Sequence, residues 1–502
     1  MNRRHMLKAS VIAAGGTSVS ATALAATAAT GALSISATAD ATTTLRFAGA
    51  LKQIAHYADA HRRGYGLPGL TLVCVAPGGY VGYARSGFAD IETQARLKAD
   101  HLFQIGSISK SFVAMCIHQL AEEGKLSLSD DIRKILPEVA LGPEPPITLT
   151  NLMDHSSGLP DNSPFFPRTP DGKLWSAFAP GTAWSYSNTG YNLLGKVVER
   201  LDGGPLDKSL ERRIFSRLGM KDARGKIVAA ERAKYAGSYT PFDAAADSHV
   251  DGRLGPAAWV NVDFGAGCIG ATSADMAHWL RYLCEAGAGR GAPLLNDSNA
   301  RAFTKATVAA PGWPAPIGEV WYGAGLAHVP VEGRTLLHHT GGMVSFSSAM
   351  HADPIAGVGC FASTNCGQQN YRPRDITAYA CAVLRSVVEP KAGLSPRPAP
   401  IKPELASKPK PSPRPTTGPV PPEFAALAGR YENDDPWQGV VTIEARADGL
   451  YADGQVKLEQ NPEGYWTLKM PVSTERYRFE GVMNGRTQIL NCSGVDFVRR
   501  DI

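Results

Sequence analysis

The 502-residue chain lacks the short signatures that mark several large protein classes. It has no Cys-x-x-Cys pair and no zinc-like spacing of cysteine and histidine, so neither a dithiol redox centre nor a zinc site is indicated. It also has no P-loop and no dinucleotide fingerprint, and no Gly-x-Ser-x-Gly elbow of an α/β-hydrolase. Beyond the N-terminal segment, no apolar run is long enough to cross a bilayer. What remains is an ordinary globular composition, 44% hydrophobic and 19% charged, with a length that suggests more than one domain.

The part of the chain that we expect to fold carries no excess of positive charge. The formal net charge is +5, but residues 1–39 hold three basic side chains without an acid, and residues 391–422 hold six against one acid. The rest of the chain therefore carries a net charge of −3. This balance gives no reason to expect a nucleic-acid partner.

The chain divides into four segments by composition. Residues 1–39 contain Arg3 and Arg4 before an Ala-, Thr- and Ser-rich stretch and end in Ala37-Thr38-Ala39, which is typical of a twin-arginine export signal with a small-residue cleavage site. We therefore expect a periplasmic or secreted protein without a membrane span; the alternative is a cytosolic protein with a disordered start. Residues 40–390 form the main domain, and residues 391–422 read as a Pro- and Lys-rich linker. Residues 423–502 alternate between short apolar runs and Asp-Gly or Asn-Gly turns, which predicts a small antiparallel β-domain.

Periodicity within the main domain places strands at both of its ends and helices in between. This order implies one sheet built from distant segments and flanked by helices, hence an α/β architecture. We expect helices near residues 46–63, 107–123, 130–136, 149–155, 189–201, 273–285 and 375–388, and strands over residues 70–76, 80–86 and within 336–364.

Three short motifs follow one another in a fixed order. They are Ser107-Ile108-Ser109-Lys110, Tyr186-Ser187-Asn188 and His339-Thr340-Gly341. A serine and a lysine three residues apart share one helix face, about one turn apart. The lysine amine can then accept the hydroxyl proton and make Ser107 a nucleophile. The other motifs supply a second proton carrier, a polar side chain and a strand that can hold substrate.

These motifs and their surroundings closely resemble the class C β-lactamase, D,D-peptidase and D-aminopeptidase superfamily of serine hydrolases, which includes penicillin-binding-protein-like members. The resemblance runs from about Leu45 to Glu389 and implies a β-lactamase/transpeptidase-like antiparallel sheet flanked by helices, while the C-terminal segment is similar to the lipocalin-like, barrel-like domains of some D-aminopeptidase-type members. The segments that carry it are Phe103 to Phe112, His155 to Pro160, Pro180 to Tyr191, Ile214 to Met220 and Gly341 to Phe346.

The resemblance assigns a role to each motif. Ser107 would be the acylated nucleophile, and Lys110 and Tyr186 would transfer its proton to the leaving group, although the sequence does not say which of them is the base. Asn188 would position a substrate amide. The backbone N–H groups of Ser107 and Gly342 would form the oxyanion hole.

His339 departs from the pattern of most β-lactamases of this kind, which have lysine there as a fixed charge for the substrate carboxylate. Histidine is only partly charged near neutral pH, so a peptide, amide or ester becomes a stronger candidate substrate than a cephalosporin. Thr340 and Gly341 would complete the substrate-binding strand. His155 reads as a hydrogen-bonded structural histidine, and nothing near His338 and His339 has the spacing of metal ligands.

The sequence therefore predicts an exported serine hydrolase that needs no cofactor or metal and forms an acyl-enzyme at Ser107. Its substrates would be small esters or peptides and amides, D-amino-acid compounds included. The alternatives are a class C-type β-lactamase and a penicillin-binding sensor or carbohydrate-binding protein that has lost turnover. The β-domain, attached after the last helix of the main domain, could cover the cleft and restrict substrate length.

Overall fold

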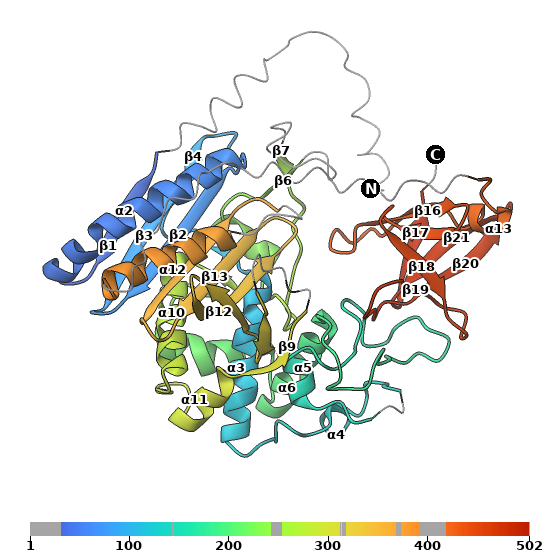
Figure 1. Ribbon diagram of the computed structural model, residues 1–502, viewed down its shortest axis with the longest axis horizontal. Helices are drawn as coiled ribbons and strands as arrows, with labels where there is room; N and C mark the ends of the chain where they lie inside the picture. Colours follow the sequence, from blue (N-terminus) through green and yellow to red (C-terminus); the bar gives the residue numbers. More distant parts are fainter. Residues whose placement is uncertain are drawn as a thin grey trace, which may run out of the picture.

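The computed structural model describes residues 32–142, 145–241, 254–311, 313, 318–367, 373–390 and 418–500. Figure 1 shows a large lobe of mixed helices and strands and, beside it, a smaller lobe made almost entirely of strands. Most of the predicted signal segment (residues 1–31) and most of the predicted linker (residues 391–417) lie outside the described residues.

A ten-stranded antiparallel sheet forms the framework of the large lobe, and its strands come from both ends of the domain. The strand order is β1-β3-β2-β14-β13-β12-β11-β10-β9, and β4 pairs with β3. Pairing of β14 with β2 joins the two ends of the domain in the middle of the sheet. The strands are β1 (Ser34–Thr38), β2 (Gly69–Ala76), β3 (Tyr80–Asp90), β4 (Ala95–Arg96), β9 (Ala306–Ala309), β10 (Trp321–Gly323), β11 (Ala327–Val331), β12 (Arg334–Gly342), β13 (Ser347–Asp353) and β14 (Val358–Thr364).

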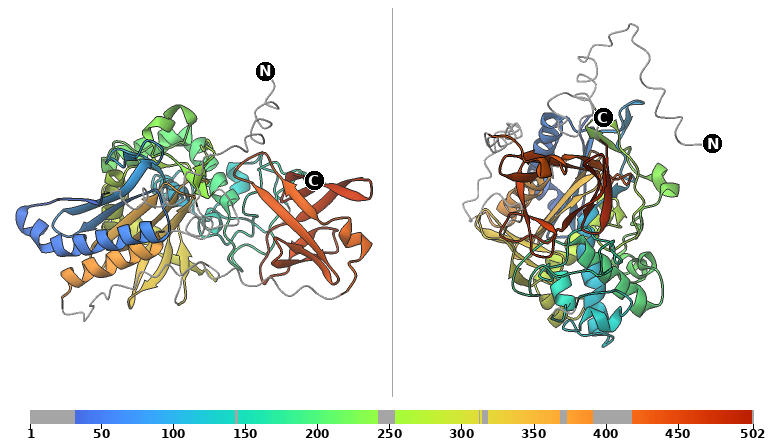
Figure 2. Two further views of the ribbon diagram at one scale, coloured as in Figure 1. Left: turned by 90° about the horizontal axis from the view of Figure 1, so that it is seen from above. Right: turned by 90° about the vertical axis from the view of Figure 1, so that its right-hand side faces the viewer.

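Helices cover both faces of this sheet and create two hydrophobic cores. Helices α2 (Ala41–Gly64) and α12 (Arg374–Val388) run side by side over one face (Figure 2) and bury one core against it. A larger core lies on the other face and contains α3 (Ser109–Glu122), α6 (Asn188–Asp202) and α10 (Ser273–Gly287). The remaining helical segments are η2 (Gly106–Ile108), α4 (Ile132–Ile135), α5 (Leu149–Met153), α7 (Leu206–Leu210), η3 (Glu211–Phe215), α8 (Ser216–Leu218), η4 (Ala229–Lys234) and α11 (Asp297–Phe303), and the short strand pairs are β5 (Phe103–Gln104) with β8 (Gly270–Ala271) and β6 (Tyr239–Pro241) with β7 (Leu254–Pro256).

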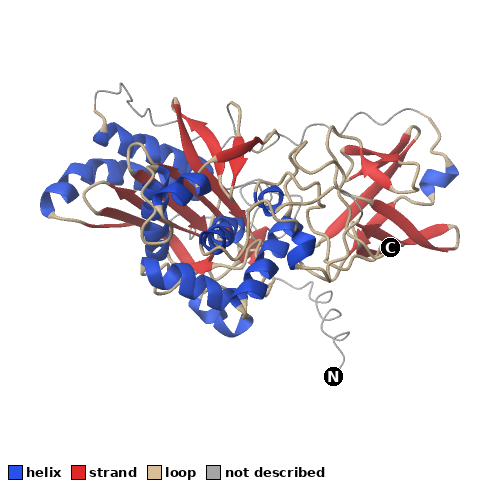
Figure 3. Ribbon diagram, turned by 90° about the horizontal axis from the view of Figure 1, so that it is seen from below, coloured by secondary structure: helices blue, strands red, loops and turns tan. Residues whose placement is uncertain are grey.

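The smaller lobe is a closed antiparallel barrel with its own core, preceded by α13 (Pro422–Ala425). Each strand pairs with the next along the chain, and β15 pairs with β22 to close the barrel. Figure 3 shows that the barrel borders a region of loops in the large lobe rather than the main sheet. Its strands are β15 (Gly429–Glu432), β16 (Val440–Arg446), β17 (Gly449–Ala452), β18 (Val456–Gln460), β19 (Trp466–Leu468), β20 (Tyr477–Met483), β21 (Arg486–Cys492) and β22 (Val495–Arg499).

The predicted fold class is confirmed, with differences at some element ends. Helix α2 begins five residues before the expected start because the Asp40 side chain accepts the Thr43 N–H as an N-cap. Ser107 lies in the 3-10 turn η2, just before α3, rather than inside the α-helix. Thr272 and Asp275 form a complete capping box at the start of α10.

Candidate active site

Ser107, the predicted nucleophile, lies on a tightly held turn. Ser107 is half-buried in η2, and Gly106 before it has a φ of 55°, a left-handed conformation that suits glycine. Every residue of α3 from Ser109 to Leu120 is buried, so the helix that follows is anchored along its length. Because the helix is immobilised by packing, the turn presents Ser107 in a defined position.

Lys110 joins the first and second motifs through its side-chain nitrogen. Its Nζ lies 3.0 Å from Ser107 Oγ, 2.5 Å from Asn188 Oδ1 and 2.9 Å from the carbonyl oxygen of Ala266. The residue is fully buried. The predicted pair of Ser107 and Lys110 is therefore in hydrogen-bond contact, and Asn188 meets the same amine.

Burial gives Lys110 the protonation behaviour of a base. Loss of solvation lowers the pKa of Lys110 to about 7, against the opposing attraction of Asp161 and Cys268. Near neutral pH, Lys110 is then unprotonated in a large fraction of the molecules, and the free amine can accept the proton of Ser107. An exposed lysine would stay protonated and could not do this.

Glycines bring β12 against the nucleophile turn. A Cβ placed on Gly341 would lie 1.9 Å from the carbonyl oxygen of Ile105, and one on Gly106 would lie 3.0 Å from the backbone nitrogen of Gly342. Only residues without a Cβ allow two backbones to approach this closely. The third motif thus lies directly beside Ser107, and the Gly342 N–H assigned to the oxyanion hole is on the segment that abuts the turn.

Tyr186 lies next to the lysine, on a segment held by His155. The Tyr186 ring centroid is 4.8 Å from Lys110 Nζ and 4.3 Å from the His155 ring. His155 has a φ of 63°, and its Nδ1 accepts the N–H of Ser187 at 3.1 Å. The buried histidine thus holds the backbone that carries Tyr186 and Asn188, in agreement with its interpretation as a structural residue.

His339 faces the protein interior in this structure. Its Nε2 lies 2.9 Å from the Tyr322 hydroxyl and its Nδ1 lies 2.5 Å from the Thr340 carbonyl oxygen, while the Trp313 ring packs 5.2 Å away. Burial, assisted by the charge of Lys110, lowers the pKa of His339 well below its ordinary value. The ring is therefore neutral and both of its nitrogens have protein partners. Direct contact between His339 and substrate remains a prediction, whereas Thr340 and Gly342 are half-exposed on the same strand.

Sequence reasoning missed two residues that hold Asn188. Asp161 Oδ1 accepts the backbone N–H of Asn188 at 2.9 Å, and Asn162 Oδ1 accepts from Asn188 Nδ2 at 3.0 Å. Burial raises the pKa of Asp161 to about 6; Glu475 acts in the same direction, and Lys110 opposes it. Both residues directly follow the His155 to Pro160 segment, which carries part of the family resemblance and in which His155 was interpreted as structural. Glu475 belongs to the barrel, and no motif in the sequence indicated that it would lie near the candidate site.

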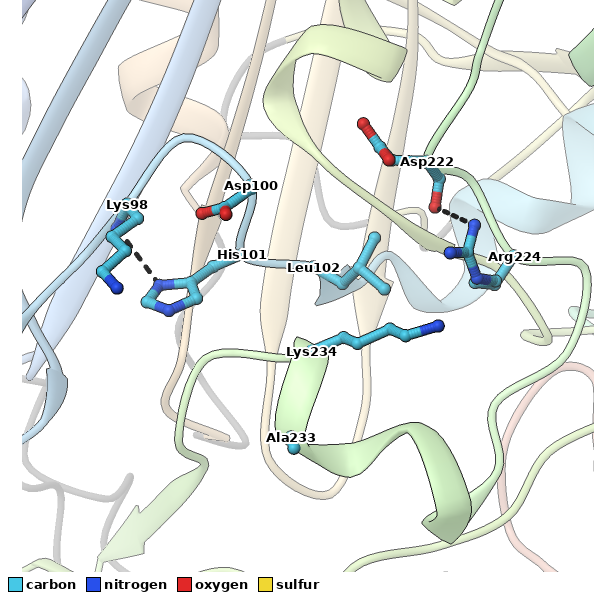
Figure 4. Close-up of a pocket in the computed structure, with 8 residues that line it drawn as sticks. All are labelled: Lys98, Asp100, His101, Leu102, Asp222, Arg224, Ala233 and Lys234. Atoms are coloured by element: carbon cyan, nitrogen blue, oxygen red, sulfur yellow. Dashed lines mark hydrogen bonds between the residues drawn. The ribbon is translucent and has the colours of Figure 1, made fainter.

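A separate surface cavity of about 320 Å³ contains none of these residues. Figure 4 shows Lys98, His101, Arg224 and Lys234 among the side chains around it. Arg224 and Lys234 both pair with Glu231, so this cavity does not present a concentrated positive charge. Within the described part of the chain, no cluster of His, Cys, Asp or Glu could hold a metal ion. No helix among the described residues is long and apolar enough to cross a membrane.

A serine in a turn just before a buried helix, hydrogen-bonded to a buried lysine beside an antiparallel sheet, is the arrangement expected of serine hydrolases of the β-lactamase and D-peptidase type. The beta-lactamase family model matches residues 52–384, more than half of the chain. The chain therefore belongs to the beta-lactamase family.

Known proteins of several activities are similar to this chain. Penicillin-binding protein 4* of Bacillus subtilis is 32% identical over 30% of this chain and 37% of its own length. Esterase EstB of Burkholderia gladioli is 33% identical over 34% of this chain and 49% of its own length. The chain thus spans less than half the length of these two relatives. The structure of the octameric penicillin-binding protein homologue from Pyrococcus abyssi superposes with a TM-score of 0.58 at 21% identity, covering 89% of this chain and 100% of that one, which shows a shared fold.

Proposed function

We propose that this protein is a serine hydrolase that cleaves amides or esters through an acyl-enzyme at Ser107. The observation that carries the proposal is the 3.0 Å contact between Ser107 Oγ and the buried amine of Lys110, whose pKa is lowered to about 7. Relatives with penicillin-binding and esterase names support the same chemistry.

The proposed reaction has two steps. Ser107 Oγ attacks the substrate carbonyl carbon and its proton passes to Lys110, with the N–H groups of Ser107 and Gly342 stabilising the oxyanion. The proton then moves to the leaving alcohol or amine, with Tyr186 as the second carrier, and the carbon–leaving-group bond breaks. Water attacks the acyl ester in the second step, releases the acid and restores the Ser107 hydroxyl.

The environment of His339 favours the hypothesis that the substrates have no free carboxylate beside the scissile bond. A neutral ring that is hydrogen-bonded to Tyr322 provides no positive charge for such a group. We therefore favour esters, amides and peptides, D-amino-acid derivatives included, over β-lactams and over peptides cleaved next to a free C-terminus.

Labelling by a fluorophosphonate probe, followed by intact mass, tests the nucleophile. The wild type should gain one adduct and Ser107→Ala none; an undiminished adduct on Ser107→Ala would place the nucleophile elsewhere. The substrate class is tested with paired D-alanyl peptides that end in a free carboxylate or in an amide. We expect kcat/KM to be about tenfold higher for the amide-ended peptide, and His339→Lys to narrow the difference. Equal values for the two peptides in the wild type would refute the preference.

We also propose that the chain is exported by a twin-arginine route. The support is the Arg3 and Arg4 pair in a region that lies outside the described residues, followed by the small-residue site at Ala39. Cleavage there would remove β1, an exposed edge strand, and leave Asp40 as the N-cap of α2. N-terminal sequencing of protein from the periplasm or medium tests this, and an unprocessed cytoplasmic chain would contradict it.

A further inference from the structure

The barrel is attached to the loop segment that leads into the second motif. Arg168 of the large lobe pairs with Glu480 at 2.6 Å and with Asp496 of the barrel. The indole N–H of Trp175 donates to the Thr474 carbonyl oxygen at 3.0 Å. The barrel therefore contacts the stretch that precedes Tyr186 and Asn188 at more than one point.

One of these contacts leads directly to the catalytic lysine. Glu475 Oε1 accepts the backbone N–H of Asp161 at 2.8 Å. Asp161 Oδ1 in turn accepts the backbone N–H of Asn188 at 2.9 Å, and Asn188 Oδ1 accepts from Lys110 Nζ at 2.5 Å. Three consecutive hydrogen bonds thus connect a barrel side chain with the amine that faces Ser107.

The barrel end of this chain of bonds is held in place. Glu475 Oε2 accepts from the Ser493 hydroxyl, which belongs to the tight turn between β21 and β22. The carbonyl oxygen of Thr474, the preceding residue, accepts the hydrogen bond from Trp175, and the Thr474 hydroxyl oxygen lies 3.5 Å from that of Ser185. Because both carboxylate oxygens of Glu475 accept hydrogen bonds and Thr474 is held against the large lobe, the Glu475 side chain cannot reorient freely. It can therefore transmit the position of the barrel to Asp161.

We propose that Glu475 is a positioning residue for catalysis, through which the barrel sets the contact of Asn188 with Lys110. The inference rests on the proposed function because it concerns the same amine. It differs from a covering role: a cover would affect long substrates selectively, whereas Glu475 should affect the acylation of Ser107 by every substrate. The barrel would then be a working part of the active site.

The test compares Glu475→Ala, Glu475→Gln and the control Glu423→Gln, which changes an exposed carboxylate on α13 of the same lobe. Acylation by the fluorophosphonate probe and turnover of p-nitrophenyl acetate and octanoate are measured in the full-length protein. We expect the alanine variant to lose about tenfold in acylation rate and in kcat for both esters, with little change in KM. Glutamine keeps an acceptor oxygen and should restore most of the rate, and the control should match the wild type.

Wild-type acylation by Glu475→Ala would overturn the proposal, as would a loss confined to the longer ester. A crystal structure of Glu475→Ala gives a readout that needs no activity. We expect the distance between Asn188 Oδ1 and Lys110 Nζ to lengthen beyond hydrogen-bond range, and an unchanged contact would also overturn the proposal. If Ser107→Ala still labels, the proposed function fails, while the crystallographic comparison continues to decide the role of Glu475.

Discussion

Replacing Gly341 with alanine tests whether the close approach of β12 to the nucleophile turn is needed for activity. The new Cβ would lie 1.9 Å from the Ile105 carbonyl oxygen, whereas such contacts in proteins are essentially never below 3.0 Å. The atom in the way is backbone, so no side chain can rotate to relieve the clash. Strand β12 and the turn must therefore separate by about 1 Å.

A separation of this size should reduce activity far more than stability. It moves the Gly342 N–H away from the oxyanion position, and a displacement of about 1 Å in an active site can lower the rate about 10²-fold. Overpacking of this kind typically costs about 1–3 kcal/mol of folding free energy, which a large domain tolerates. We therefore expect a folded Gly341→Ala variant with kcat/KM reduced about a hundredfold.

The assay is kcat/KM for a p-nitrophenyl ester, together with the thermal unfolding midpoint. Gly204→Ala is the matched control, because a Cβ at that position would meet no atom within 4 Å. The control should have wild-type kinetics. A Gly341→Ala enzyme within about threefold of wild-type kcat/KM would show that the approach of the two backbones does not govern catalysis.

Three further predictions concern the charge state of the lysine, the lobe interface and the thiols. The kcat/KM of the wild type should rise with pH through about 7, because the folded-state pKa of Lys110 lies there and the protonated amine cannot accept the Ser107 proton; a flat profile between about pH 6 and pH 8 would contradict this. Arg168→Ala should lower the free energy of unfolding of the barrel by only about 1 kcal/mol, since Arg168 is half-exposed, and a loss of several kcal/mol in chemical denaturation would be inconsistent with a surface pair. All eight cysteines have free thiols, seven of them buried, so we expect eight thiols to react with Ellman's reagent in denaturant and few without it, and fewer than eight in denaturant would reveal a disulfide.

Local pattern was sufficient for the elements whose side-chain periodicity agrees with their final burial. Helix α3 falls within the predicted helix near residues 107–123 and is buried along almost its whole length. The Asn484-Gly485 turn between β20 and β21 needs positive φ at both residues, and both have it. The ends of the elements were less predictable. The Asp40 N-cap sets the start of α2 earlier than expected. Gly106, which contacts β12, has a left-handed conformation, and Ser107 after it lies in a 3-10 turn.

Some residues of the candidate site could likewise be predicted from local spacing, and others could not. Ser107 and Lys110 could be paired from the sequence because three residues of helical geometry bring their side chains together. Asn188 and Gly342 came from resemblance, and no local rule would place Asn188 beside Lys110 or Gly342 beside the turn that carries Ser107. The orientation of His339 could not be predicted, because it depends on Tyr322 from another strand and on Trp313 from a loop.

The sequence by itself determined the spacing that pairs Ser107 with Lys110 and the order of strands and helices, since these follow from local spacing and hydrophobic periodicity. Only the tertiary structure decided the pKa of Lys110, because desolvation is a property of everything packed around the amine. The same holds for the neutral state of His339 and for the contact of Glu475 with Asp161, which lie 314 positions apart in the chain. Contacts between distant segments form only when the whole chain folds, so they cannot be predicted from local sequence pattern.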